Sequence, residues 1–499
     1  MAALPPCAAS PPAPESARSA AGAMVLAVLA LTALRLLWLA AKPLDLYPDE
    51  AQYWLWSRHL AFGYFSKPPL IAWLIALTTA IFGNGEFAVR VSAPLLHAIA
   101  AFFIYGIGLR LYDRRVGVWS ALAYASLPGV SVSAFLMSTD AILLPCWAGA
   151  LYAFVRAREE GGKKWWVWTG IGIGAGLLAK YAMVYFFLSA FALVLIFRSE
   201  RRHLKGLLAA SGIAFLILLP NLWWNWRHSF ASVGAVEANA ALGGSLFHPL
   251  AFLRFFGSQF GVFGPLFFAV LVFLLVRPRA LAEPRSRLLA AFILPALLII
   301  LIESLLSRAH ANWAAPAYVA ATVLVVARLI ESGRPGLIRL SIVFHLVAVA
   351  LIWGGAEALP AFGVSLPARY DPLHRLKGWR TLGERVGAVL AQHKGYGLLA
   401  DDRETLAALV YYVHPHPLDA VGWNPTRQIK SEWDLTNDVS RYPGRNFLVV
   451  SMHHLAGQMR PSFASLTPLG HLVIPVDPGF ARRYSLYLAQ DFKGYLRRR

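Results

Sequence analysis

The chain has 499 residues, of which 58% are hydrophobic and only 14% are charged, with 17 Trp and 30 Phe. This apolar surface excludes an ordinary soluble enzyme, because it needs a bilayer as its solvent, and predicts a polytopic α-helical membrane protein. The net charge of +20 does not indicate a nucleic acid partner, since the Lys and Arg residues form short clusters between apolar runs. The two cysteines offer neither a disulfide framework nor a metal cluster.

The N-terminal residues 1–22 are rich in Ala, Pro and Ser and nearly uncharged, which predicts a disordered cytoplasmic tail. The apolar run 23–41 is close to spanning length and has no convincing cleavage site. We therefore interpret it as an uncleaved first span rather than a signal peptide. It opens a predicted transmembrane domain over residues 23–360.

The segment 42–85 concentrates polar chemistry directly after the first span. It contains the adjacent carboxylates Asp49 and Glu50, the aromatic residues Tyr53 and Tyr64, and Lys67. Its apolar piece, 67–82, is short for a hydrocarbon core of about 30 Å, so we expect an interfacial or re-entrant helix there. We interpret the segment as a catalytic periplasmic loop. The alternative is an interfacial loop with a solvated acidic pair and an aromatic belt.

Ten further apolar runs follow, and together with the first span they predict about 11 to 13 transmembrane helices. The runs lie at 86–109, 116–136, 141–155, 165–182, 183–197, 206–224, 251–276, 288–306, 313–330 and 337–356. Basic clusters lie between them, at 110–115, 156–164, 198–205, 277–287 and 328–339. All of these clusters fall on one side if the 67–82 segment does not cross, and the positive-inside rule makes that side cytoplasmic.

The composition changes in the C-terminal part, where charges and turns become frequent. Short apolar runs at 397–401, 446–451 and 484–489 predict buried strands, and 402–412 reads as an amphipathic helix. We therefore expect residues 361–499 to form a soluble α/β domain, on the same periplasmic side as the 42–85 loop.

Three carboxylates are candidates for chemistry. Asp49 and Glu50 would point about 100° apart on a helix, so we expect one to face a substrate and the other to hold a structural partner. Asp140 begins an apolar helix, where it is either an N-cap or a functional carboxylate at the membrane edge.

Three cations lie on the same predicted side as these carboxylates. Lys67, Arg90 and Lys180 together suit an anionic phosphate group at the membrane surface. Snorkelling to the interface is the alternative for each lysine alone.

No pattern supports a metal or another cofactor. His310 is a lone membrane-edge histidine, for which a hydrogen-bonded structural role is favoured over metal binding, and the other histidines lack ligand spacing. Phosphate-binding glycine loops and dinucleotide fingerprints are absent from the sequence, so a nucleotide-sugar donor is not supported.

Several stretches of the chain resemble the GT-C class of membrane glycosyltransferases. They are Asp49-Glu50-Ala-Gln-Tyr53, Lys67-Pro-Pro-Leu70, Gly83-Asn-Gly-Glu86-Phe87-Ala-Val-Arg90, Asp140 and Leu178-Ala-Lys180. The similarity is greatest to the bacterial branch with the lipid A aminoarabinose transferase, and more distant to the dolichyl-phosphate-mannose protein mannosyltransferases. It is specific over about 40–185, looser through Asn312-Trp-Ala-Ala-Pro316, and extends to Ala400-Asp-Asp-Arg403 and Trp423-Asn-Pro425 in the C-terminal part.

The resemblance implies an inverting enzyme of the bacterial inner membrane. Its donor would be a sugar on a polyprenyl phosphate, and its acceptor a hydroxyl of an envelope glycolipid such as lipid A or lipopolysaccharide core. The resemblance implies Asp49 as the general base, Glu50 and Asp140 as assisting carboxylates, and Lys67, Arg90 and Lys180 as ligands of the donor phosphate. We also expect substrate contacts from Tyr53, Tyr64, His310 and Asn312.

Ser66 marks a departure from the aminoarabinose branch, which typically carries an acidic residue immediately before its Lys-Pro-Pro motif. This difference argues against a zinc site and against aminoarabinose, whereas a hexuronic acid or a hexose is compatible. Two alternative functions are a protein O-mannosyltransferase-like enzyme and a transporter or flippase of lipid-linked sugars. The transporter predicts internal repeats with helices broken at the midplane, and the sequence shows no such repeats.

Overall fold

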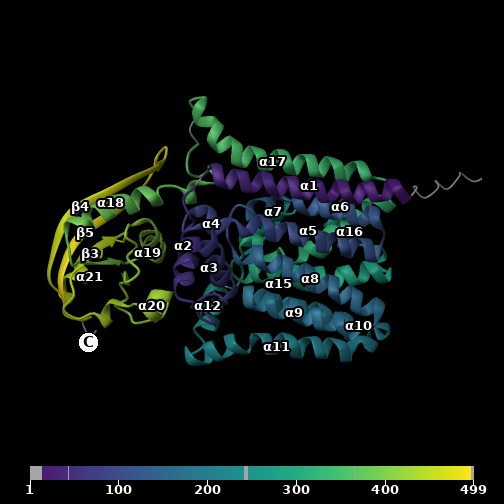
Figure 1. Cartoon of the computed structure of the whole chain (residues 1–499), viewed down its shortest axis with the longest axis horizontal. Helices are drawn as coiled ribbons and strands as arrows, with labels where there is room; N and C mark the ends of the chain where they lie inside the picture. The colour runs from purple at the N-terminus through teal and green to yellow at the C-terminus, as the bar shows by residue number, and fades with distance from the viewer. Residues whose placement is uncertain (1–13, 43, 241–245, 365, 454, 496–499) are drawn as a thin grey trace, which may run out of the picture.

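The computed structural model describes residues 14–42, 44–240, 246–364, 366–453 and 455–495. These residues form a bundle of long helices with a mixed-sheet domain at one end (Figure 1). The bundle is built from α1 (Pro14–Ala41), α2 (Pro48–Arg58), α3 (Leu70–Phe82), α4 (Glu86–Arg90), α5 (Ser92–Leu111), α6 (Arg114–Ser126), α7 (Pro128–Ser133), α8 (Thr139–Glu160), α9 (Lys163–Ala179), α10 (Val184–Ile196), α11 (Leu204–Arg227), α12 (Ala231–Ala240), α13 (Pro249–Val262), α14 (Pro265–Leu275), α15 (Pro284–Leu306), α16 (Ala317–Glu331) and α17 (Pro335–Ala361).

Within the described ranges, six helices are long and apolar enough to cross a membrane, or seven if the pair α13–α14, bent by 119°, is one span. The prediction from the sequence gives more spans, because it counts apolar runs rather than uninterrupted helices. The run 116–136 is divided between α6 and α7 at Leu127-Pro128, since proline cannot continue the first helix. Helix α10 has only 13 residues, fewer than the about 20 that cross a hydrocarbon core. The chain is thus a polytopic helical membrane protein with fewer full-length spans than predicted.

The first helix begins at Pro14, earlier than the predicted start of the span at residue 23. Residues 14–22 are therefore helical, and the rest of the predicted tail, residues 1–13, lies outside the described residues. Arg35 of this helix faces the protein, where its guanidinium donates to Ala125 O at 2.7 Å and to Ser131 Oγ at 2.8 Å. These partners compensate a charge that would be costly in lipid.

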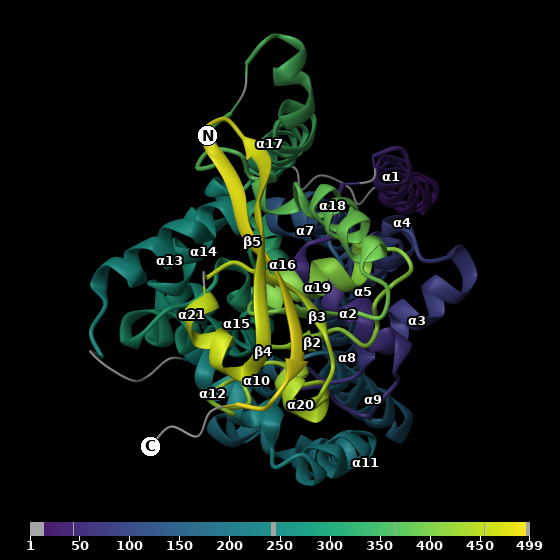
Figure 2. The ribbon, with the colours of Figure 1, turned by 90° about the vertical axis from the view of Figure 1, so that its left-hand side faces the viewer.

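The C-terminal part contains a five-stranded mixed sheet in the order β2-β1-β3-β5-β4. Its elements are α18 (Trp379–Gln392), β1 (Gly397–Ala400), α19 (Arg403–Tyr412), β2 (Val421–Gly422), α20 (Glu432–Thr436), β3 (Phe447–Ser451), α21 (Ala456–Met459), β4 (Phe463–Asp477) and β5 (Phe480–Phe492). Strand β1 runs parallel to β2 and β3, and β5 runs antiparallel to β3 and β4. The long β4–β5 hairpin lies on the side of the domain away from the bundle (Figures 1 and 2). The three predicted strands correspond to β1, β3 and part of β5.

Helix α19 docks the sheet domain onto α2 of the bundle. The Tyr412 hydroxyl accepts a hydrogen bond from Leu46 N at 2.6 Å, and the Tyr411 hydroxyl donates to Asn84 O at 2.6 Å. Apolar side chains of both parts share one buried cluster, which includes Trp54 and Leu406. Helix α2, which carries Asp49 and Glu50, is consequently packed between the helical bundle and the sheet domain, and most of its residues are buried.

Candidate active site

Helix α2 turns the adjacent carboxylates Asp49 and Glu50 into different environments. Pro48 occupies its first turn, and the Glu50 carboxylate accepts a hydrogen bond from Tyr47 N at 2.9 Å, which caps the helix start. Glu50 is 1% exposed, whereas 38% of the Asp49 side chain is exposed. The two residues thus have separate surroundings, as the helix geometry requires.

Arg90 is the buried partner of Glu50. Its Nε and Nη2 donate to the two Glu50 carboxylate oxygens at 2.9 and 2.6 Å, and its remaining contacts are with Leu44 O and Asp45 O. Met137 N also donates to Glu50, at 2.8 Å. Because Arg90 is only 2% exposed and its donors are used within the protein, its placement does not fit the phosphate ligand that the sequence predicts.

Asp140, Lys180 and Asn312 come together from three distant segments. Asp140 lies in the first turn of α8, and Lys180 follows the last residue of α9. Lys180 Nζ donates to Asp140 Oδ1 at 2.7 Å, and Asn312 Nδ2 donates to Asp140 Oδ2 at 2.5 Å. Ser138, not Asp140, is the N-cap residue of α8, so the carboxylate is free to hold the lysine in place.

Lys67 lies in the loop between α2 and α3, close to Lys180. Burial, followed by the neighbouring Lys180 charge, lowers the pKa of its ammonium group, while Asp49 and Asp140 act in the opposite direction. Across the described ranges, this ammonium group forms no hydrogen bond or ion pair with the protein. A half-buried cation without a protein partner is a candidate ligand for an anion.

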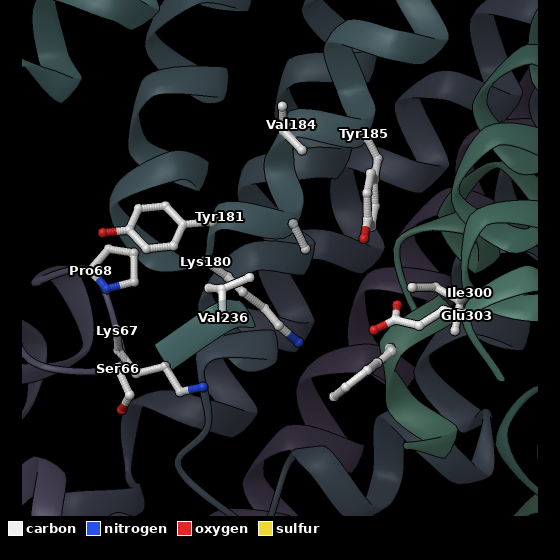
Figure 3. Close-up of a pocket in the computed structure, with 12 residues that line it drawn as sticks. Ser66, Lys67, Pro68, Lys180, Tyr181, Val184, Tyr185, Val236, Ile300 and Glu303 are labelled. Atoms are coloured by element: carbon white, nitrogen blue, oxygen red, sulfur yellow. The ribbon is translucent and has the colours of Figure 1, made fainter. Parts of the chain in front are cut away.

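The first cavity of the site has a volume of about 270 Å³ and is mostly apolar. Figure 3 shows the ammonium groups of Lys67 and Lys180 pointing into it, with the Glu303 carboxylate on the opposite wall. Val184 and Ile300 contribute apolar surface. The cavity therefore combines two cations with a lining that suits a hydrocarbon chain. We name it the apolar cavity.

The second cavity, of about 440 Å³, shares the Ser66-Lys67 segment with the apolar cavity and is lined by Asp49. Arg403 of α19 enters it from the sheet domain and donates through one nitrogen to Asp49 Oδ1 at 2.8 Å and to Gln52 Oε1 at 2.5 Å. Lys430 also lines this cavity. We name it the polar cavity, and Lys67 belongs to the walls of both cavities.

Of the four predicted substrate-contact residues, some lie at the two cavities or hold a residue there, and others do not. Tyr53 lines the polar cavity and Asn312 holds Asp140. Tyr64 instead stacks on Trp56, with 4.6 Å between ring centroids, and its hydroxyl bonds to nearby backbone groups. His310 is exposed beside Trp313 and lines neither cavity, although Trp313 lines the apolar one.

Sequence reasoning missed Arg403 and Glu303 as site residues. The sequence contains a feature that could have indicated each of them. Arg403 is the first residue of a helix, where a positive charge opposes the helix dipole and calls for an anionic partner. Glu303 is an acidic residue inside the apolar run 288–306, and intramembrane carboxylates are functional candidates by default. Among the described residues, no three His, Cys, Asp or Glu side chains gather in a way that could hold a metal ion.

The chain is similar in sequence to several known proteins. A family model described as dolichyl-phosphate-mannose-protein mannosyltransferase matches residues 66–224. The lipid A galacturonosyltransferase RgtD of Rhizobium johnstonii is 33% identical over 392 residues, which cover 78% of this chain and 82% of that protein. The lipopolysaccharide core galacturonosyltransferase RgtB of the same organism is 31% identical over 39% of this chain and 40% of its own.

The fold is similar to that of ArnT from Cupriavidus metallidurans, solved bound to undecaprenyl phosphate. The TM-score is 0.62 at 17% sequence identity, over 94% of this chain and 97% of that chain. The sequence similarity to RgtD extends over most of both chains, so it covers the helical bundle as well as the loop that holds the carboxylates. The chain therefore belongs to the GT-C family of glycosyltransferases that use polyprenyl-phosphate-linked sugars.

Proposed function

We propose that this enzyme transfers a sugar, with inversion, from a polyprenyl phosphate to a hydroxyl of an envelope glycolipid, either lipid A or lipopolysaccharide core. The observation that carries the proposal is the position of Lys67 between the apolar cavity and the polar cavity. A donor phosphate bound at Lys67 would place its hydrocarbon chain on one side of the residue and its sugar on the other, next to Asp49.

On the donor side, Lys67 and Lys180 bind the phosphate. As the bond between the sugar and the phosphate oxygen breaks, negative charge grows on the phosphate, and two fixed cations stabilise it. Asp140 and Asn312 hold Lys180 in position through contacts of 2.7 and 2.5 Å. The similarity in fold to an ArnT structure that holds undecaprenyl phosphate supports this arrangement.

On the acceptor side, Asp49 is the general base. It takes the proton of the acceptor hydroxyl while that oxygen attacks the anomeric carbon from the face opposite the phosphate. Arg403 and Gln52 orient the Asp49 carboxylate, and the buried Glu50–Arg90 pair fixes the helix that carries it. In this assignment Glu50 and Arg90 are positioning residues, which replaces the phosphate-binding role predicted for Arg90.

A hexuronic acid is the sugar that we propose. RgtD and RgtB are both galacturonosyltransferases, and Ser66 is compatible with such a donor. The polar cavity contains three cations, Lys67, Arg403 and Lys430, but a single carboxylate, Asp49. This excess of positive charge suits a carboxylated sugar.

A protein acceptor and a transport function have weaker support. The match to the protein mannosyltransferase model ends at residue 224, so it covers the donor-binding segment and leaves out the sheet domain that contributes Arg403. Membership of a glycosyltransferase family replaces the transporter interpretation.

We propose that the sheet domain and Asp49 lie on the periplasmic side. Asp140 at the start of α8 and Lys180 after α9 meet at the sheet-domain end of the bundle, so the basic connection between these helices lies at the far end (Figure 1). By the positive-inside rule that far end is cytoplasmic. In this arrangement the shorter helices that run alongside the six candidate spans, such as α9 and α16, cross the membrane with them.

The proposal is tested by mass spectrometry of envelope glycolipids from cells with the wild-type protein, Asp49→Asn, or no protein. We expect one glycolipid to lose the mass of one hexuronic acid residue both in the deletion and in the Asp49→Asn strain. Asp113→Asn is the matched control, because Asp113 caps α6 at the far end of the bundle and asparagine keeps that cap. If Asp49→Asn retains the modification that the deletion loses, Asp49 is not the base.

A further inference from the structure

Glu303 has no part in the reaction described above, although it lines the apolar cavity. It lies in the last turn of α15, a membrane-spanning helix that ends at Leu306. Across the described ranges, its side chain forms no hydrogen bond or ion pair with the protein. It is therefore a carboxylate without a protein partner, at the end of the bundle that carries the sheet domain.

The position of Glu303 breaks two rules of local stability. The C-terminal end of a helix carries partial negative charge, which repels an acidic side chain in the last turn. A carboxylate that follows an uninterrupted apolar stretch, here 288–302, is also costly at the membrane. Residues that break local rules without a compensating contact are typical of functional positions. Both costs indicate that this carboxylate is retained for a function.

The Glu303 carboxylate faces the two cations of the apolar cavity. Figure 3 shows it on the wall opposite the ammonium groups of Lys67 and Lys180. Lys180 forms its ion pair with Asp140 instead, at 2.7 Å. A phosphate group held by the two lysines would thus lie on the side of the cavity that faces Glu303.

The charge of the bound phosphate changes during the proposed reaction. A sugar on a polyprenyl phosphate is a phosphodiester with about one negative charge, whereas the polyprenyl phosphate that remains is a monoester with about 1.5 to 2 at pH 7. Two fixed cations alone would bind this product more tightly than the donor and keep the site occupied. A carboxylate that faces the phosphate repels each ligand in proportion to its charge. It therefore weakens the binding of the product more than that of the donor.

From these observations we propose that Glu303 sets the discrimination between the donor and the spent polyprenyl phosphate, and so promotes product release. This inference rests on the proposed function, because it takes the phosphate to be bound by Lys67 and Lys180. Glu303 makes and breaks no bond in this role, since it acts on the ligand through its charge.

Glu303→Gln tests the proposal, because it removes the charge and keeps the size of the side chain. A transfer assay with added undecaprenyl phosphate gives both the Ki of this product and the KM for the donor. We expect the Ki to fall about tenfold and the donor KM only about threefold, because Coulomb repulsion scales with the charge of the ligand. Product inhibition should accordingly slow the reaction earlier in the variant than in the wild type.

Two variants serve as controls. Glu303→Asp keeps the charge on a shorter side chain, so the ratio of Ki to donor KM should stay at its wild-type value. Glu237→Gln makes the same chemical change on α12, where Glu237 is exposed next to Val236 of the apolar cavity. Because an exposed carboxylate is screened, Glu237→Gln should leave both constants unchanged.

Direct binding separates this inference from the proposed function. The probe is undecaprenyl phosphate in detergent micelles, and calorimetry measures its affinity for the wild type, Glu303→Gln and Lys67→Met. An absence of binding to the wild type, or full binding to Lys67→Met, would refute the proposed donor site and the inference with it. If Lys67→Met loses binding while Glu303→Gln keeps the wild-type affinity, the inference alone fails. An equal gain for donor and product, or a higher donor KM in Glu303→Gln, would also overturn it.

Discussion

Arg403 connects the sheet domain to Asp49, the proposed base, and its replacement by methionine tests whether that connection matters for catalysis. The guanidinium donates to Asp49 and Gln52 across 354 and 351 residues of sequence. Arg403→Met keeps an unbranched apolar stem and removes the guanidinium with both hydrogen bonds. The Asp49 carboxylate then loses the partner that fixes its direction.

The expected loss follows from the geometry. A hydrogen bond to a charged group contributes about 1.5 to 3 kcal/mol when it is buried. Here the Arg403 and Asp49 side chains are 36% and 38% exposed, so solvent screening reduces the contribution to about 1 to 2 kcal/mol. We therefore expect kcat to fall about 5- to 30-fold, with the KM for the donor unchanged, because Lys67 and Lys180 are untouched.

The assay measures transfer of labelled sugar in proteoliposomes, with Arg380→Met as the control. Arg380 of α18 also joins the sheet domain to the bundle, through ion pairs with Asp45 and Glu86, and its side chain is 44% exposed. It lies outside the polar cavity. If both variants lose activity equally, Arg403 only docks the domain. If Arg403→Met keeps the full kcat, the orienting role is refuted.

Two further predictions concern pH. Burial and the nearby Lys180 lower the pKa of Lys67, so this ammonium group loses its proton at a lower pH than an ordinary lysine. The KM for the donor should therefore rise in the alkaline range, and Lys67→Arg should shift that rise to higher pH; identical profiles for the two proteins would exclude Lys67 as a phosphate ligand. Burial raises the pKa of Glu432 from 4.5 to about 7, although Phe65 N opposes the shift. The native state then binds this proton more tightly than the unfolded state, so stability falls as pH rises from about 4.5 to about 7, by up to about 3 kcal/mol. Glu432→Gln keeps an acceptor for Phe65 N and should melt at a higher temperature than the wild type at pH 8 but not at pH 4; an equal difference at both values would contradict this assignment.

The sheet domain shows how far local sequence predicts a fold. The apolar runs of β1 and β3 and the amphipathic α19 are visible in the sequence because each is buried along its length. Strand β4 is not visible in the sequence, because it is an edge strand of the sheet and most of its side chains are exposed. Pro468 and Pro475 lie beside its register shifts, where a missing N–H costs no ladder bond.

The site shows a second limit of prediction from the sequence, which is the choice of partner for each charged residue. Asp140 and Lys180 are predictable because each lies at the end of an apolar run, and helix ends on one side of a membrane meet. Arg90 is equally visible as a cation. The sequence does not show, however, whether its partner is a phosphate group or the Glu50 carboxylate. Burial decides between them: at 2% exposure, a guanidinium needs a permanent counter-charge, and Glu50 supplies it.

In the proposed assignment, the two substrates contact different parts of the chain. Of the residues that the structure describes, those that line the apolar cavity lie between Ser66 and Trp313, within the helical bundle. The polar cavity adds Arg403, Ile429 and Lys430 from the sheet domain. Changes in the sheet domain can therefore alter which acceptor is used while the donor site stays intact. The segment that the protein mannosyltransferase model matches, residues 66–224, contains Lys67 and Lys180 and leaves out the sheet domain, as this assignment predicts for a shared donor and a different acceptor.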